Sequence, residues 1–121
     1  MSDDEITGGQ WLNQRYHEDA LKKRGSYFSV AQWSMEKFGI GAAAMSNYMN
    51  DKRKPTGDNL DSLLAHYGLE VFPRFKIRMP EGIDLDVIRA KVAIKKARPE
   101  TKKRIMDLIN SVLDSDEWKA N

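Results

Sequence analysis

The chain lacks several features that would narrow its function at once. It has no cysteine, which excludes disulfides and thiolate metal sites, and its two histidines, His17 and His66, are too far apart to form a local metal motif. Its longest apolar run, residues 39–45, is far too short to cross a membrane, and its acidic start is unlike a secretory signal. We therefore expect a cytoplasmic protein that holds no metal and no other cofactor.

Recognisable catalytic motifs are missing as well. With 121 residues, 40% of them hydrophobic, the chain can form one compact domain with an appendage, which leaves little room for a large catalytic cleft. We find no nucleophile–base pair, phosphate-binding glycine loop or set of histidine and carboxylate ligands at a useful spacing. We therefore expect that the protein is not an enzyme. With a net charge of only +2, binding to nucleic acid would depend on how the charges are distributed.

The most informative stretch is residues 31–55, AQWSMEKFGIGAAAMSNYMNDKRKP. It predicts two short helices joined by a tight turn at Gly39 and followed by a basic loop. Glycine suits such a turn because the backbone there must adopt a positive φ. Ser29 is expected to cap the first of these helices, Val30 to Phe38, and Trp33 is expected to lie in the core. Four apolar residues would hold the two helices at a steep angle: Phe38, Ile40, Met45 and Tyr48.

This stretch resembles the helix-turn-helix of lambda-repressor-like (Cro/repressor-type, Xre family) regulators. The residues that match the family's pattern of glycine, aliphatic residue, second aliphatic residue and serine are Gly39, Ile40, Met45 and Ser46. A basic loop from Lys52 to Pro55 follows, and the segment from Asn59 to Glu70 resembles the family's next helix. The resemblance covers roughly residues 10–70, about half of the chain.

Two positions depart from the family pattern. Met35 stands where the family has an alanine at a close contact between helices, which predicts a wider spacing or a shifted first helix. Asn50 and Asp51 stand where the family ends its recognition helix with glycine. Asparagine tolerates the left-handed conformation, so Asn50 can replace that glycine.

We expect an all-α fold. The resemblance implies a five-helix lambda-repressor-like DNA-binding domain over residues 10–72, preceded by a flexible acidic arm over residues 1–9. Its first helix, Gln10 to Arg24, has apolar residues at four-residue spacing and stops at Gly25. Asp58 or Asn59 would cap the helix that follows the basic loop.

The remainder of the chain predicts an extended segment and a helical hairpin. Residues 73–83 contain alternating charged and apolar positions, typical of a short half-buried strand, although an extended linker fits equally well. Residues 84–121 predict a C-terminal helical hairpin, a candidate dimerisation or partner-binding element because it cannot bury much surface alone. The apolar residues of its last helix follow the i, i+3, i+4, i+7, i+8 spacing: Ile105, Leu108, Ile109, Val112 and Leu113.

Residues 42–50 would form the recognition helix, which in this family enters the major groove of DNA. Alanine can touch thymine methyl groups, and asparagine is suited to bidentate pairing with adenine. The expected base contacts are Ala42, Ala43, Ser46, Asn47 and Asn50. Outside the motif, the same residues would describe a plain alanine-rich helix with solvated asparagines.

The basic loop directly after this helix is placed to hold DNA phosphates, although a bare charge run is usually only a solvated surface. In the family a glutamine near the start of the first motif helix contacts the backbone, and the next helix start can bind phosphate. The expected phosphate contacts are Gln32, Lys52, Arg53, Lys54 and Asn59.

Charge in the last helix runs against the helix dipole. Three basic residues, Lys102, Lys103 and Arg104, occupy its first turns, and Asp114, with Asp116 and Glu117 after it, crowds its end. A phosphate contact or an acidic partner would explain the basic end, and so would ordinary surface variation.

The resemblance implies a sequence-specific regulator that binds double-stranded DNA, a repressor of bacterial or phage type acting as a homodimer on an inverted repeat. The alternative is an antitoxin or anti-repressor-like interaction protein that binds a protein partner through its C-terminal helices.

Overall fold

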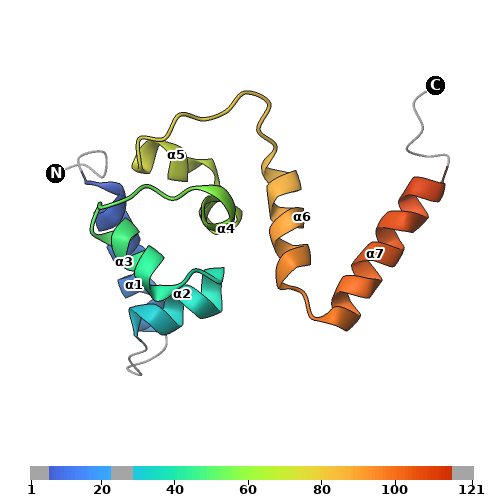
Figure 1. Ribbon diagram of the computed structural model, residues 1–121, viewed down its shortest axis with the longest axis horizontal. Helices are drawn as coiled ribbons and strands as arrows, with labels where there is room; N and C mark the ends of the chain where they lie inside the picture. Colours follow the sequence, from blue (N-terminus) through green and yellow to red (C-terminus); the bar gives the residue numbers. More distant parts are fainter. Residues whose placement is uncertain (1–5, 23–28, 116–121) are drawn as a thin grey trace.

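The computed structural model describes residues 6–22 and 29–115, and this part of the chain is helical without a strand. The expected all-α class is therefore confirmed. The helices are α1 (Gly8–Lys22), α2 (Val30–Phe38), α3 (Ala42–Met49), α4 (Gly57–Tyr67), α5 (Val71–Arg74), α6 (Leu85–Lys96) and α7 (Pro99–Asp114), with a 3₁₀ turn over Gly68–Glu70. In Figure 1, α1 to α5 pack together, α6 lies between them and α7, and α7 stands outermost. No helix in the described ranges is both long and apolar enough to span a bilayer.

Helices α1 to α5 enclose one hydrophobic core built around aromatic side chains. Trp11 and Trp33 are each 1% exposed, so the expected core position of Trp33 is confirmed. Trp11 meets Tyr67 edge to face with ring centroids 5.0 Å apart, and Trp33 meets Phe38 in the same way at 5.1 Å. The first pair joins α1 to α4, which are distant in the sequence, whereas the second lies within α2; such ring contacts stabilise beyond the buried area alone.

Helix α1 starts earlier than its amphipathic pattern indicates. The expected arm over residues 1–9 is wrong for its last two residues, because Gly8 and Gly9 are buried inside α1. A Cβ at Gly8 would lie 2.3 Å from the Phe75 ring, and one at Gly9 would lie 2.5 Å from the Met49 carbonyl oxygen. Both glycines therefore serve close packing. Residues 1–5, like the expected helix stop at Gly25, lie outside the described residues.

Helix α2 and the turn after it agree with the sequence prediction. The Ser29 hydroxyl accepts a hydrogen bond from the Gln32 amide at 3.1 Å, and the helix ends at Gly39 with φ 70°. The Gly39 amide donates to the Met35 carbonyl and the Ile40 amide to the Ser34 carbonyl. The bond from Gly39 to Met35 is that of an αL cap, which requires a residue in the left-handed region.

The side-chain contact between α2 and the turn is made by Ser34 and not by Met35. Ser34 is completely buried, and its hydroxyl donates to the Ile40 carbonyl at 2.7 Å. Met35 is 56% exposed. Met35 therefore does not occupy the close helix contact at which a wider spacing or a shifted first helix was expected, because its side chain is turned toward solvent.

The region around α4 and α5 differs from the sequence prediction at both ends. Helix α4 begins at Gly57 with Thr56 as its N-cap residue, two or three positions ahead of the expected cap at Asp58 or Asn59. The alternating segment forms no strand: α5 covers its first residues, and Phe75 is buried against Trp11, their ring centroids 6.3 Å apart. The globular unit thus extends beyond the expected boundary at residue 72, and the remaining residues to 84 connect α5 to α6 as a linker.

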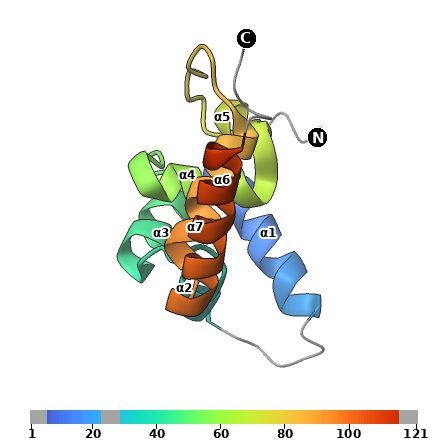
Figure 2. The same ribbon diagram turned by 90° about the vertical axis from the view of Figure 1, so that its right-hand side faces the viewer.

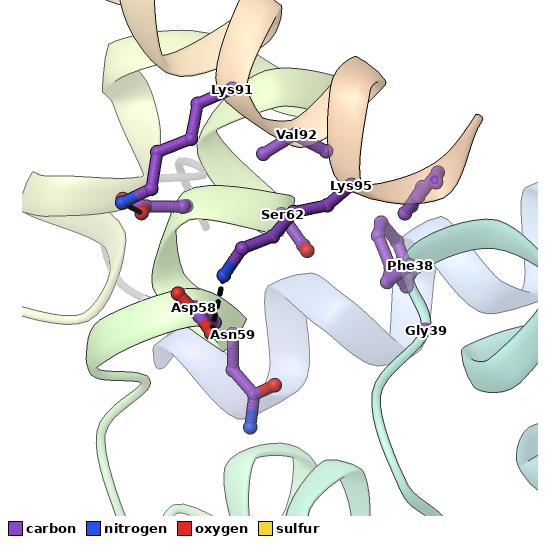
Figure 3. A pocket seen from close by; sticks show the side chains of 10 residues that line it. Phe38, Gly39, Asp58, Asn59, Ser62, Lys91, Val92 and Lys95 are labelled. Carbon is purple, nitrogen blue, oxygen red and sulfur yellow. Dashed lines mark hydrogen bonds and ion pairs between the residues drawn. The ribbon is translucent and has the colours of Figure 1, made fainter. Parts of the chain in front are cut away.

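Helix α6 is docked on α4. Val92 is its one buried residue, and two ion pairs flank it: Lys91 with Asp61 at 3.0 Å and Lys95 with Asp58 at 2.8 Å (Figure 3). The hydrogen bond from Lys95, together with its charge, lowers the pKa of Asp58. Exposed ion pairs are individually weak, so they orient α6 more than they stabilise it.

Candidate nucleic-acid interface

Helix α3 separates cleanly into an inward and an outward face. Met45, Tyr48 and Met49 are buried in the core. The residues that the sequence proposed for base contact share the opposite side of the helix, where four are exposed and Asn47 is half-buried: Ala42, Ala43, Ser46, Asn47 and Asn50. The structure therefore brings all five candidates together on one surface, as a 3.6-residue period requires.

The polar candidates on this face differ in how far they are already engaged. The Asn50 side-chain amide donates to the Ser46 carbonyl at 2.8 Å and to the Ser46 hydroxyl at 3.3 Å. The Asn47 side chain, in contrast, has no hydrogen-bond partner in the described part of the chain. Asn47 is therefore the amide that can pair with a base without first breaking a protein contact.

The basic loop is held against the end of α3 by backbone hydrogen bonds. The Asn47 carbonyl accepts from the amides of Lys52, at 2.8 Å, and Arg53, at 3.3 Å. The chain turns at Asp51, which has φ 57°, whereas Asn50 has φ −100°. The residue in the left-handed conformation at the end of α3 is thus Asp51, not Asn50 as expected.

Asp51 also joins this loop to the start of α1. Its carboxylate accepts from the Thr7 hydroxyl at 2.6 Å and from the Gly9 amide at 2.9 Å. Because the partners lie more than 40 residues apart in the chain, no local sequence signal could reveal them. The loop that presents the cations is consequently fixed from two sides, by α3 and by α1.

Several cations gather beside this loop. Lys52 and Arg53 are exposed, and neither forms an ion pair with another described residue. Lys54 is exposed too, and its ammonium group donates to the Lys76 carbonyl at 3.1 Å. A shallow hollow of about 290 Å³ here is lined in part by Arg53, Lys54, Arg74 and Lys76. Arg74 and Lys76 were not among the sequence candidates, because their alternating pattern pointed to a strand.

The other two phosphate candidates are placed less favourably. The Gln32 side-chain amide is exposed but donates to the Glu36 carboxylate at 3.0 Å, which brings a negative charge to that position. The Asn59 amide is half-buried and donates to the Tyr48 hydroxyl at 2.9 Å. Asn59 therefore connects α4 to α3, and its expected phosphate contact stays a prediction.

A second hollow, of about 210 Å³, lies between the end of α2, the start of α4 and α6 (Figure 3). Its charged lining residues include both α4–α6 ion pairs, so those charges are already balanced within the chain. The hollow is a seam between packed helices. Among the described residues no group of three or more histidine, aspartate or glutamate side chains could hold a metal ion.

Comparison of the chain with protein-family models, with curated proteins and with solved structures finds no match.

Proposed function

We propose that this protein is a sequence-specific regulator that binds double-stranded DNA, a repressor of bacterial or phage type that acts as a homodimer on an inverted repeat. Helix α3 enters the major groove, where Asn47 and Ser46 contact base edges. Lys52 and Arg53 hold the phosphates beside it. Two copies on one DNA face would read half-sites about 34 Å apart and would block a promoter by occupying it.

One observation carries this proposal: the exposed face of α3 and the basic loop form one continuous, internally fixed surface. The Asn47 carbonyl accepts the amides of Lys52 and Arg53. The loop therefore cannot move far relative to the face that bears the Asn47 side chain. A fixed distance between base-reading and phosphate-holding groups is what sets the register of a protein on the duplex.

The proposal is tested first by selecting sites from random duplex DNA with the purified full-length protein. We expect enrichment of an inverted repeat. Failure to enrich any sequence at low salt would refute the proposal, since the electrostatic part of binding is strongest there.

Two substitutions then separate base reading from phosphate holding. Asn47→Ala should cost about 1–3 kcal/mol at a single base position, and Arg53→Ala should weaken binding to all sequences and reduce the salt slope by about one. Lys91→Ala is the matched control, because Lys91 is already paired with Asp61 and releases no counterion on binding. If Asn47→Ala weakened all sequences equally, Asn47 would not be a base contact.

A further inference from the structure

Helix α7 has an apolar stripe that the rest of the chain leaves largely exposed. The stripe consists of Ile105, Leu108, Ile109, Val112 and Leu113. No residue of the 16 in α7 is buried, and Leu108 and Val112 are 67% and 51% exposed. In Figures 1 and 2, α7 lies on the outside of the molecule, with α6 between it and the helices of the core. An apolar helix face of this kind indicates a surface that another element covers.

The charges of α7 are arranged against its dipole. Lys102, Lys103 and Arg104 are exposed in its first turns, and none forms an ion pair with another described residue. Asp114 ends the helix, and Asp116 and Glu117 follow it in the sequence. Glu100 in the first turn suits the helix dipole, but the three cations that follow it and the acidic end oppose the dipole. A partner that presents the opposite order would remove the penalty.

We propose that α7 pairs with α7 of a second copy of this chain in antiparallel orientation. A two-fold interface must be complementary to itself. The α7 helix meets this condition, because in an antiparallel pair the basic residues near the start of each copy lie beside the acidic end of the other copy. The apolar residues and the charged residues of α7 are both arranged symmetrically about Ile109, as an antiparallel pair requires. Ile109 lies four residues from Ile105 and from Leu113, and five residues from Arg104 and from Asp114.

A parallel pair would not satisfy the same pattern. It would place the three cations of one helix against the same three cations of the other, and like charges at this distance repel. The inference rests on the homodimer in the proposed function and names the surface that forms it. It can nevertheless be tested without DNA.

Cysteine cross-linking distinguishes the orientations, because the natural chain has no cysteine and every disulfide reports an introduced thiol. In an antiparallel pair centred on Ile109, residue 105 lies level with residue 113 of the second copy, and residue 112 is only about 1.5 Å further along the axis. The two copies of residue 105 are then about 12 Å apart along the helix axis, at 1.5 Å per residue. A disulfide spans a Cα separation of at most about 7 Å. A mixture of Ile105→Cys and Val112→Cys should therefore form the mixed disulfide, and Ile105→Cys alone should not cross-link efficiently.

Self-association of the full-length protein is measured by sedimentation without DNA. We expect a concentration-dependent dimer that Val112→Asp weakens at least tenfold. Ser111→Asp places the same charge outside the stripe, about 100° around the helix from Val112, and should weaken the dimer far less. Reversing the basic end with Lys102→Glu and Lys103→Glu should also weaken it. Circular dichroism of each variant checks that the helices are retained.

Three results would overturn the inference: a monomer at all concentrations, a dimer insensitive to Val112→Asp, or preferential cross-linking of residue 105 to itself. A monomer would instead favour a different protein, or the chain's own core, as the cover of α7. These results are separable from the proposed function. If only the dimer inference fails, the natural protein still enriches a specific DNA site; if only DNA binding fails, the dimer and its cross-links remain.

Discussion

Replacing Gly9 by alanine tests the close approach of α1 to the end of α3. A Cβ at this position would lie 2.5 Å from the Met49 carbonyl oxygen and 2.8 Å from the Tyr48 carbonyl oxygen. Both obstacles are backbone atoms, so no side chain can rotate away, and α1 must shift instead. The shift would disturb the hydrogen bond from the Gly9 amide to Asp51, which is 2.9 Å long. The anchoring of the basic loop would be weakened with it.

The expected net cost is about 1–2 kcal/mol. Overpacking of this kind costs about 1–3 kcal/mol. Alanine in a helix interior gains up to about 1 kcal/mol over glycine, and less here because Gly9 is the second residue of α1. For a chain of this size each kcal/mol lowers the melting temperature by about 3–5 °C.

Thermal unfolding followed by circular dichroism measures this effect. The matched control is Gln14→Ala, an exposed position of the same helix, which should change the melting temperature little. A Gly9→Ala protein as stable as the natural one would show that α1 and α3 are not in the close contact described.

Two further substitutions test interactions of α2. Ser29→Ala removes the hydroxyl that accepts from the Gln32 amide and should cost about 1 kcal/mol in urea unfolding, whereas Ser29→Thr should retain most of the cap. Burial raises the pKa of Asp19, but hydrogen bonds from Lys37 (2.6 Å) and Trp33 (2.8 Å) outweigh it and hold that pKa below its ordinary value. This stabilisation is present above the unfolded pKa of about 4 and is lost as pH falls through the folded pKa. Asp19→Asn should therefore lower the free energy of unfolding by about 1–2 kcal/mol at pH 7 and by less at pH 3. An equal loss of unfolding free energy at the two pH values would contradict this assignment.

The sequence by itself determined the elements whose signals are local. Helix α2 has the predicted bounds because its cap, Ser29, and its left-handed terminator, Gly39, act on backbone groups within a few residues. The outward face of α3 was also predictable, since helical periodicity decides which side chains share a side once the buried positions are known.

Only the tertiary structure decided the contacts between distant segments. Gly8 and Gly9 have the composition of a loose arm, yet the approach of Phe75 and Met49 makes them part of a packed helix. The alternating segment has the period of a strand, but no second strand is present in the described chain to pair with it, and Phe75 instead fills the core beside Trp11.

The candidate site divides in the same way. The face of α3 that we propose to read bases follows from residue spacing along that helix. The position of its basic loop depends on Asp51, which binds Thr7 and the Gly9 amide across more than 40 residues. The docking of α6 likewise pairs Lys95 with Asp58. From the sequence alone, Lys95 could be explained only by the favourable interaction of a cation with the C-terminal end of a helix dipole. Caps, turns and helical faces depend on residues that are neighbours in the sequence, whereas these pairings form only once folding has brought distant groups together.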